Sequence, residues 1–573
     1  MAETLRRGPI DSMLRFFPAF TLILMIGPVC AGLIGTMLPA FGYLPALGGD
    51  GISIDPWRDL LLQPGLAISV RLSLVNGLVA TLISLSLVML FCAAWQGTKV
   101  FVVMQRLLSP ILSVPHAAAA FGLAFLIAPS GWIVRAVALF AGWDRPPDIV
   151  TLHDPMGIAL IAGLVAKEIP FLLLMTLAAL PQADADRTRQ VALTFGYGRV
   201  VGWLKAVFPR IYPQIRLPVL AVLAYSTSVV DVAMILGPTT PAPLAVRILG
   251  WLSDPDLSHR FLASAGAMLQ LILVLVAMAI WRAGETLAGF WGRIWAEGGM
   301  RAQGDGAIRS FSAGAAVLTA TVVFLGLASL LVWSFAGYWS FPEFLPRSFS
   351  LHLWMREYDM LGAILGTTLV IAVLSVMVAI ALVLGCLENE TRRFQIPGQG
   401  VMFLIYLPLL MPQISFMFGL QVFFTGIGLE RTLISVVIVH LIFVLPYVFL
   451  SLADPFRALD PRYGQTALCL GASPARVFWG VRLPLLTRAV LTAFAVGLAV
   501  SVGQYLPTLL IGAGRFATVT TEAVALASGG DRRMIGIYGL LQMILPFAGF
   551  ALALLIPAVV FRHRRGMADH NRI

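Results

Sequence analysis

The sequence predicts an all-α polytopic membrane protein with about twelve transmembrane helices. We expect two parallel six-helix repeats, with both termini on the cytoplasmic side. The 573-residue chain is 59% hydrophobic and only 12% charged, whereas soluble domains are about a quarter charged. Apolar stretches long enough to cross a bilayer recur along its whole length. In addition, one spaced signature occurs twice, 275 residues apart.

Twelve apolar stretches reach the length of about 20 residues that a spanning helix needs. A further apolar piece, 132–143, is shorter and contains Arg135, so we interpret it as a segment lying in the membrane interface. The first stretch is long and has no clear small-residue cleavage site, which favours an uncleaved span over a signal peptide. The expected spans are 17–39, 67–94, 107–128, 156–180, 218–237, 262–281, 312–335, 359–387, 400–424, 432–453, 486–511 and 536–561.

The basic residues are unevenly distributed. The formal net charge is +11, and the arginines concentrate in loops 181–217, 282–310 and 454–488 and in the two tails. If the spans alternate, all of these segments lie on one side, which is the cytoplasmic side by the positive-inside rule. We therefore favour basic membrane-surface loops and expect no nucleic-acid partner. The arginines of the tails include Arg6, Arg7, Arg15, Arg562, Arg564 and Arg565.

Cysteine usage predicts neither a disulfide framework nor a metal site. The four cysteines fall in expected spans or in a cytoplasmic loop, and no two of them have CxxC spacing. We expect no cofactor. The four are Cys30, Cys92, Cys386 and Cys469.

The chain repeats itself in parallel. Gly196 and Pro209 match Gly471 and Pro484 at an offset of 275, and Pro115 matches Pro412 at an offset of 297. The difference of 22 residues falls in loop 129–155, where an insertion is best tolerated. Six spans per half return the chain to its starting side, so the halves are not inverted repeats. The predicted domains are a first half 1–283, a cytoplasmic linker 284–310 and a second half 311–573.

The repeated signature lies in the two longest basic loops. Each copy predicts a short helix, a glycine that ends it, a second helix and a proline at re-entry into the membrane. A soluble partner can grip such rigid loops, although a helix lying on lipid headgroups has a similar composition. The repetition favours docking. The residues are Gln190, Ala192, Gly196 and Pro209 in the first copy and Gln465, Ala467, Gly471 and Pro484 in the second.

This pattern resembles the EAA motif of the membrane subunits of ABC importers, the binding-protein-dependent permeases of the type I, MetI-like fold. The resemblance covers both halves and is similar to the fused permeases of the thiamine, iron(III) and Ynj-type importers. Segments 115–123 and 166–170 contribute to it. Two departures stand out, because Gln190 and Gln465 replace the glutamate of the motif, and Val191 and Thr466 replace its first alanine.

The resemblance implies a multi-pass permease of a bacterial inner membrane. It implies a cytoplasmic ABC ATPase dimer below the two loops and a periplasmic substrate-binding protein that delivers a small solute. A thiamine-like or other cationic solute is our guess from the family likeness, with iron(III) and polyamines open.

The chain is not expected to hydrolyse ATP itself. A P-loop needs a lysine directly after a glycine, and none of the three lysines, Lys99, Lys167 and Lys205, follows one. ATP hydrolysis therefore belongs to a separate chain, and we expect no enzymatic activity here.

Several polar residues fall inside expected spans, where such residues are costly and usually functional. Lys167 and Asp231 form an interhelical pair in one interpretation, whereas Asp231 and Glu168 contact a cationic substrate in another. His116 and Gln413, each after a proline, line the pathway or bond a carbonyl that the proline frees. The candidate pathway residues are His116, Lys167, Glu168, Asp231, Gln413 and Gln504, with Asn76 and Tyr505 weaker candidates.

Two other functions remain open at this point. An ion- or proton-coupled secondary transporter with parallel repeats predicts transport by this chain alone, with an essential carboxylate. A membrane scaffold or sensor predicts no co-purifying ATPase. Neighbouring genes for an ATPase and a binding protein would separate the importer from both.

Overall fold

The computed structural model describes residues 14–393 and 398–562, and this part of the chain is helical apart from loops and two isolated bridges. Nine helical stretches are long and apolar enough to cross a membrane, or up to eleven if each of two bent helix pairs is one span. The multi-pass helical class is thereby confirmed. Arg6, Arg7, Arg564 and Arg565, which support the predicted side of the termini, lie outside the described residues.

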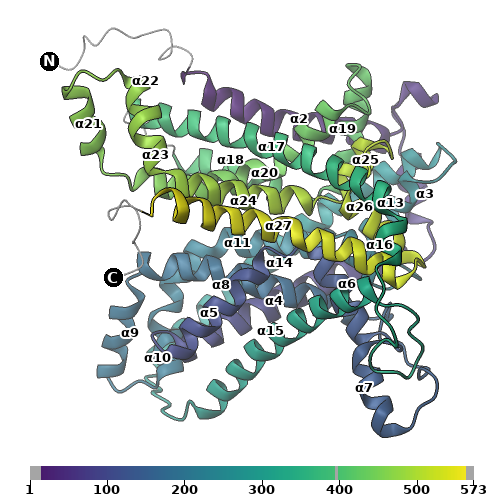
Figure 1. The fold of residues 1–573 in the computed structure, drawn as a ribbon, viewed down its shortest axis with the longest axis horizontal. Helices are drawn as coiled ribbons and strands as arrows, with labels where there is room; N and C mark the ends of the chain where they lie inside the picture. Colours follow the sequence, from purple (N-terminus) through teal and green to yellow (C-terminus); the bar gives the residue numbers. More distant parts are fainter. Residues whose placement is uncertain (1–13, 394–397, 563–573) are drawn as a thin grey trace.

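The first repeat begins with a long apolar helix and ends with a 39-residue helix that extends well past the apolar region. Between them lie long apolar helices and shorter helices at both ends of the molecule (Figure 1). In order they are α2 (Phe17–Ala40), η1 (Pro45–Leu47), α3 (Asp55–Leu61), α4 (Leu66–Trp95), α5 (Lys99–Leu112), α6 (His116–Ile127), α7 (Trp132–Ala141), α8 (Ile158–Gln182), α9 (Ala185–Thr194), α10 (Arg199–Ala206), α11 (Phe208–Ser228), α12 (Asp231–Leu236), α13 (Leu244–Leu252) and α14 (His259–Glu297).

The second repeat follows nearly the same order of elements. Its helices α20, α25 and α26 begin 275 residues after α8, α12 and α13, which is the offset of the repeated signature. In order they are α15 (Gly306–Phe335), α16 (His352–Arg356), α17 (Tyr358–Arg393), α18 (Gln399–Leu410), α19 (Ile414–Gly426), α20 (Leu433–Arg457), α21 (Pro461–Cys469), α22 (Pro474–Val477), the π-helix η2 (Phe478–Arg482), α23 (Leu483–Leu485), α24 (Thr487–Val502), α25 (Leu506–Gly512), α26 (Val519–Ala525), η3 (Leu526–Ser528) and α27 (Arg532–Val560).

The expected count of about twelve spans is not confirmed, and the expected third and fifth spans of each half are broken. In the third span of each half, the helix breaks next to a proline, Pro115 in the first half and Pro412 in the second. Proline lacks a backbone N–H, and the residue before it disfavours helical conformation. Helices α18 and α19 meet at 97°. The fifth spans break after Ser228 and Val502. The third apolar stretch is His116–Ala141, formed by α6 and α7, rather than 107–128.

The first helix of each repeat packs against the other repeat. Helix α2 lies along α19 of the second repeat, and α15 lies along α6 of the first repeat as well as α27 of its own, an exchange that is visible in Figure 1. Paired glycines allow the close approach, as small residues do at helix crossings in membranes. A Cβ on Gly35 would lie 2.6 Å from the Gly419 carbonyl oxygen, and a Cβ on Gly122 would lie 2.8 Å from the Gly326 carbonyl carbon.

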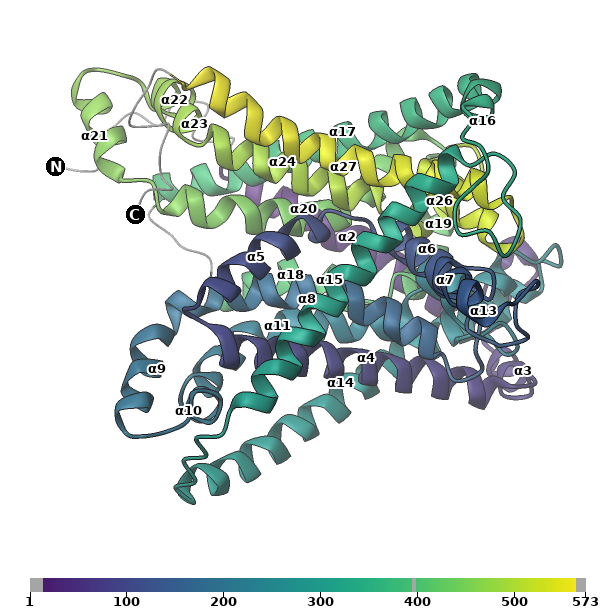
Figure 2. The ribbon, with the colours of Figure 1, turned by 60° about the horizontal axis from the view of Figure 1, so that its bottom comes forward.

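The short helices gather at the two ends of the bundle. Helices α9, α10, α21 and α22 lie at one end, where α2 begins and α27 ends, whereas α3, α13, α16 and α26 lie at the other (Figures 1 and 2). We call these the loop end and the far end. Both repeated signatures therefore lie on the same side of the bundle, as the sequence predicted.

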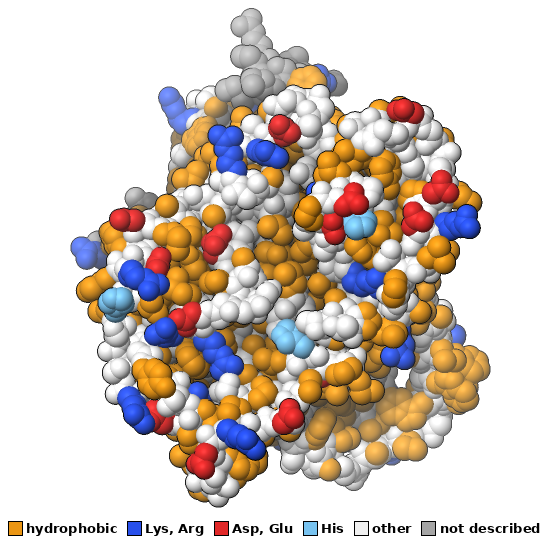
Figure 3. Space-filling model, turned by 90° about the vertical axis from the view of Figure 1, so that its right-hand side faces the viewer, with side chains coloured by type: hydrophobic (Ala, Val, Ile, Leu, Met, Phe, Trp, Pro, Cys, Tyr) orange, Lys and Arg blue, Asp and Glu red, His pale blue; other side chains and the backbone are white. Residues whose placement is uncertain are grey.

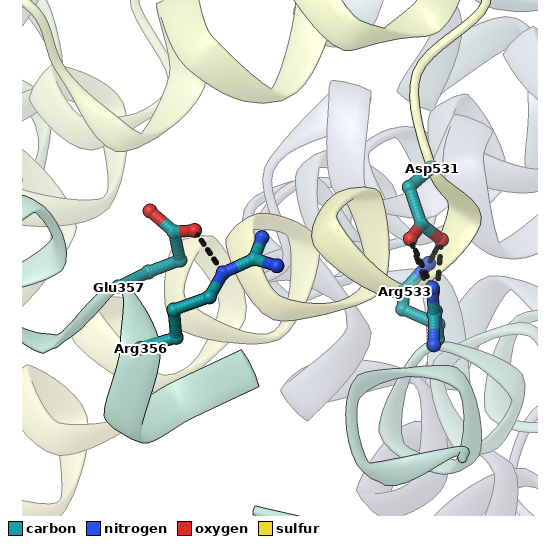
Figure 4. Close-up of polar contacts among 4 residues, drawn as sticks. All are labelled: Arg356, Glu357, Asp531 and Arg533. Atoms are coloured by element: carbon teal, nitrogen blue, oxygen red, sulfur yellow. Dashed lines mark hydrogen bonds and ion pairs between the residues drawn. The ribbon is translucent and has the colours of Figure 1, made fainter. Parts of the chain in front are cut away.

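The far end carries charges of both signs among apolar side chains (Figure 3). Several charges are paired locally, with Arg356 on Glu357 at 2.8 Å and Arg533 on Asp531 at 2.7 Å (Figure 4). The segment 132–143, which the sequence predicts to lie in the membrane interface, contains α7, and α7 instead forms part of the candidate span His116–Ala141. Its Arg135 donates to the carbonyls of Ser340 and Glu343. The inserted loop of the first half is thus held by the loop between α15 and α16 of the second half.

Candidate functional site

The first helical loop, residues 185–206, is a helix–turn–helix built around glycine. Helix α9 ends before Gly196, whose φ of +79° is the left-handed conformation that favours glycine. Ala192, the small residue of the signature, is 7% exposed and packs close to Gly202 of α10. The two short helices are thereby held tightly against each other, while Gln190 lies on the exposed side.

Gln96 fastens this loop to the bundle. It follows the last residue of α4 and is 3% exposed. Its amide nitrogen donates to Asp186 of α9 at 3.1 Å, and its amide oxygen accepts from Trp203 of α10 at 2.6 Å. Arg199 donates to its backbone carbonyl. One side chain at the end of α4 therefore fixes both helices of the loop.

The linker between the repeats holds the same loop from the other side. The Gly198 amide donates to the Arg301 carbonyl at 2.8 Å, and the Val200 amide donates to the Asp305 carboxylate at 3.0 Å. The Lys205 ammonium donates to the Met300 carbonyl at 3.0 Å. The Asp305 carboxylate thus accepts a hydrogen bond from one of the backbone amides that the N-terminus of α10 leaves without a helical partner.

Arg199 lies where these contacts converge. Burial lowers its pKa, and the positive charges of Arg189 and Arg309 lower the pKa further. The negative charge of Asp305 opposes this shift. Arginine nevertheless stays protonated in proteins. The residue therefore keeps its charge beside α10.

The second helical loop, residues 461–485, has the same plan with a different anchor. Gly471 has a φ of +84° after α21, and Ser473 caps α22 through the Arg476 amide. The Arg482 guanidinium donates to Glu388 of α17 at 2.6 Å, and Arg392 donates to the same carboxylate at 2.7 Å. The end of the second span of each half therefore holds the loop, through an amide in one half and an ion pair in the other.

Both loops expose a matched pair of large apolar side chains. Leu193 and Phe195 are 40% and 64% exposed, and Leu468 and Leu470, at the same offset of 275, are 44% and 83% exposed. The two side chains of each pair flank one residue and precede the left-handed glycine. Contiguous exposed apolar surface commonly marks an interaction site. A groove of ≈ 530 Å³ adjoins the first pair, lined in part by Asp184, Arg187, Val191, Phe195 and Lys205.

Gln190 and Gln465 are both exposed, so the glutamate position of the motif points away from the bundle. Pro209 lies in the first turn of α11, and Pro484 lies in α23. Ala467 is partly buried. All eight signature residues are thus brought to the loop end in two similar arrangements. What each contributes to binding stays a prediction.

A second group of polar residues lies between the two repeats. The His116 Nε2 is 3.3 Å from the Glu168 carboxylate, and the His116 ring lies 4.7 Å from that of Tyr225. Asp231 acts electrostatically on Tyr225, Tyr505 and His116, and Glu168 acts on Tyr225 and Tyr447. We call this set the central cluster, and its members are His116, Glu168, Tyr225, Asp231, Tyr447 and Tyr505.

Lys167 does not pair with Asp231, contrary to one interpretation of the sequence. Its ammonium donates to the carbonyls of Ile111 and Leu112, both at 2.9 Å. These carbonyls end α5, where the break before Pro115 leaves them without helical partners. His116 also departs from its expected structural role, because it bonds Glu168 rather than a freed carbonyl.

The other predicted pathway residues lie at the helix breaks of the second half. Gln413 precedes the first residue of α19 and is partly buried, and Gln504 lies between α24 and α25 with 9% exposure. A Cβ on the neighbouring Gly503 would lie 3.8 Å from the Pro115 side chain. A break of one half therefore meets a break of the other.

Buried side chains bridge the breaks in the fifth spans. His440 of α20 bonds Ser501 at 2.8 Å and Thr508 at 2.9 Å, one on each side of the break between α24 and α25. In the first half, Gln270 donates to the Thr227 carbonyl at 3.1 Å. These breaks are thus built into the fold.

No local pattern in the sequence singles out Tyr225, Tyr447 or Gln96. A tyrosine in an apolar span and a glutamine at a span end are ordinary in composition. Their importance comes from long-range neighbours, which a single sequence does not encode in its spacing.

Comparison with known proteins gives a consistent result. Residues 377–567 match the family described as binding-protein-dependent transport system inner membrane component. The inner membrane ABC transporter permease protein YnjC of Escherichia coli (strain K12) is 30% identical over 564 residues, 97% of this chain and 99% of YnjC.

Two other relatives match over shorter segments. The putrescine transport system permease protein PotI of the same organism is 26% identical over 110 residues, 18% of this chain and 39% of PotI. A probable sulfate transport system permease protein cysT of Anthoceros angustus is 31% identical over 93 residues, 16% of this chain and 30% of cysT.

Proposed function

This chain belongs to the ABC transporter permeases of the binding-protein-dependent inner membrane family, and from that membership we propose that it is the membrane subunit of an importer. In this proposal it carries a small solute from the periplasm to the cytoplasm of a bacterial cell. ATP is hydrolysed by a separate dimer of cytoplasmic ABC ATPase subunits. A periplasmic substrate-binding protein delivers the solute.

The matched apolar pairs on the two helical loops carry the proposal. A pair of like ATPase subunits needs two similar binding surfaces. The two apolar pairs offer such surfaces at one end of the molecule, Leu193 with Phe195 and Leu468 with Leu470. Each surface is tied to the end of a spanning helix, by Gln96 or by Glu388. A movement of either ATPase subunit would therefore be passed directly into the bundle.

The orientation follows from the same loops. They carry much of the basic charge, so the loop end faces the cytoplasm by the positive-inside rule. The far end then faces the periplasm and receives the binding protein. Its scattered charges of both signs suit a transient, polar interface better than a permanent apolar one.

The solute pathway runs between the two repeats, past the central cluster and the helix breaks beside it. Family membership argues against the secondary transporter and against the non-transporting scaffold. His116, Glu168 and Asp231 line this pathway in our proposal, and Gln413 and Gln504 lie at its breaks. Lys167 instead supports the end of α5.

The test is co-purification of the full chain with a cytoplasmic ATPase encoded by a neighbouring gene. The double variant Phe195→Asp, Leu470→Asp places a charge in each apolar pair and is expected to abolish the complex. The control is Ile52→Asp, a residue 84% exposed outside both helical loops. Unchanged co-purification of the double variant would refute the docking role.

A further inference from the structure

Asp231 is a buried carboxylate without a counter-charge. It is 9% exposed, and its hydrogen bonds come from the backbone amides of Asp231 and Val232. Among the described residues no lysine or arginine forms an ion pair with it. A charge taken out of water is costly unless it is paired. A positively charged ligand that reaches Asp231 would supply the missing partner and offset the cost of burying the carboxylate.

The nearest buried ammonium group is already engaged. Lys167 directs its Nζ to the carbonyls of Ile111 and Leu112 at 2.9 Å each. The group therefore serves the end of α5 and offers little to an anion in the central cluster. Glu168, the next residue, contacts His116 instead. Asp231 is therefore the carboxylate of the cluster that has no ion-pair partner among the described residues.

Tyrosine side chains from both repeats lie near the two carboxylates of the central cluster. Tyr225 comes from α11 of the first repeat, whereas Tyr447 and Tyr505 come from the second repeat. Aromatic faces attract cations, and tyrosine hydroxyls accept hydrogen bonds from ammonium groups. The His116 side chain is 35% exposed, and Tyr225 and Tyr447 are also partly exposed. The cluster is thus incompletely packed on one side.

The cluster lies at mid-depth. Glu168 is residue 11 of the 25 in α8, and Tyr447 is residue 15 of the 25 in α20. Either residue is therefore roughly 15–20 Å from the ends of its helix at 1.5 Å per residue. Ionisable groups at such a depth are rare and mark substrate or ion pathways.

We propose that the central cluster is a binding site for a small organic cation, such as a protonated amine or a positively charged heteroaromatic ring. The inference rests on the proposed function, since it names the solute class for the passage between the repeats. The described residues hold no group of three His, Cys, Asp or Glu side chains placed for a metal ion. The aromatic lining and the single unpaired carboxylate fit an organic cation better than a bare metal.

The names of the relatives do not choose the class, because PotI is named for putrescine, a cation at neutral pH, and cysT for sulfate, an anion. The test therefore compares both charges on the purified full chain in lipid nanodiscs, without ATPase or binding protein. Putrescine, thiamine, tetramethylammonium and sulfate are titrated separately, and binding is followed by thermal stabilisation and calorimetry. At least one of the three cations is expected to bind, and sulfate is not.

Variants then locate the site. Asp231→Asn is expected to weaken cation binding by at least about tenfold, because it removes the charge that the ligand meets. Glu168→Gln serves as a second variant if the first is poorly folded. The matched control is Glu285→Gln, a buried carboxylate that bonds Tyr212 and Arg282 outside the cluster, and it should bind like the wild type.

Three results would overturn the proposal. They are preferential binding of sulfate, cation binding unchanged in Asp231→Asn and Glu168→Gln, and no binding of any of the three cations up to about 10 mM. None of these results depends on the ATPase. Loss of the ATPase complex in the co-purification test and loss of cation binding here can therefore be told apart.

Discussion

Glu388 receives the Arg482 guanidinium at 2.6 Å, which ties the end of α17 to the π-helix of the second helical loop. The carboxylate is 4% exposed and the guanidinium 20%. The matching junction in the first repeat uses the neutral amide of Gln96. The two halves thus attach their helical loops to the end of a spanning helix by different interactions, an ion pair in the second half and amide hydrogen bonds in the first.

We expect Glu388→Gln to destabilise the protein by about 1–3 kcal/mol, because Arg482 and Arg392 both lose a charged acceptor in a partly buried place. Chemical denaturation in mixed micelles measures the free energy of unfolding. The control is Glu390→Gln, two residues along the same helix, whose pair with Arg457 is more exposed and should contribute less than about 1 kcal/mol. Equal losses in the two variants would contradict a special role for Glu388.

Gly122→Ala is expected to destabilise the crossing of α6 and α15. The added Cβ would lie 2.8 Å from the Gly326 backbone, and overpacking of this kind costs about 1–3 kcal/mol. In the same measurement Gly314→Ala in α15 should be neutral or stabilising, since nothing lies within 4 Å of its Cβ and alanine favours helix by about 1 kcal/mol over glycine. A neutral Gly122→Ala would show that the two helices can separate without loss.

Lys167→Met should lower stability by about 1–3 kcal/mol, because it leaves the carbonyls of Ile111 and Leu112 without donors in a buried place. Methionine keeps the length of the side chain, so packing changes little. Thermal unfolding in nanodiscs provides the readout. Binding of organic cations should persist in this variant, which separates the support of α5 from the charge of the central cluster. Loss of cation binding at unchanged stability would place Lys167 in the site instead.

Asp531 gives a small pH dependence at the far end. Partial burial raises the pKa of Asp531, but hydrogen bonds from the Arg533 side chain and amide outweigh it, so the pKa lies below its ordinary value of 3.8. A lowered folded-state pKa stabilises the protein above the unfolded pKa, and this stabilisation is lost as the pH falls through the folded pKa. Both partners are about 40% exposed, so less than about 1 kcal/mol is expected.

Asp531→Asn removes this contribution while keeping a side chain that can cap α27. Its stability should fall slightly below that of the wild type at neutral pH and match it once the pH is below the folded-state pKa of Asp531. Unfolding curves across this range provide the measurement. A constant difference at every pH would mean that capping, and not the charge of Asp531, accounts for the effect.

Much of the membrane architecture can be predicted from local sequence patterns. Apolar length identified most of the spanning helices, and the spacing of Gly196 and Gly471 placed two left-handed turns at one end of the bundle. These features depend on residues close in sequence. Pro115 and Pro412 also indicate the helix breaks from local sequence, but a count of spans based on hydropathy does not detect such interruptions.

The remaining features depend on contacts between distant segments. No periodicity in α2 indicates that it packs on α19 of the other repeat as well as on α14 of its own. Lys167 and Asp231 have opposite charges and neighbouring spans, yet the freed carbonyls of α5 bind the ammonium more directly. Tyr447 joins the central cluster from α20, within a stretch of that helix that is otherwise apolar on both sides.

The exchange of α2 and α15 between the repeats bears on why both halves occupy one polypeptide. Each half meets the other at a close crossing of paired glycines, so part of the packing surface of each half is supplied by the other. A covalent linker makes their meeting intramolecular, with an effective concentration in the millimolar range for a short flexible connection. Two unlike halves are thereby always supplied in equal numbers, and pairing of identical halves is disfavoured from the moment of synthesis.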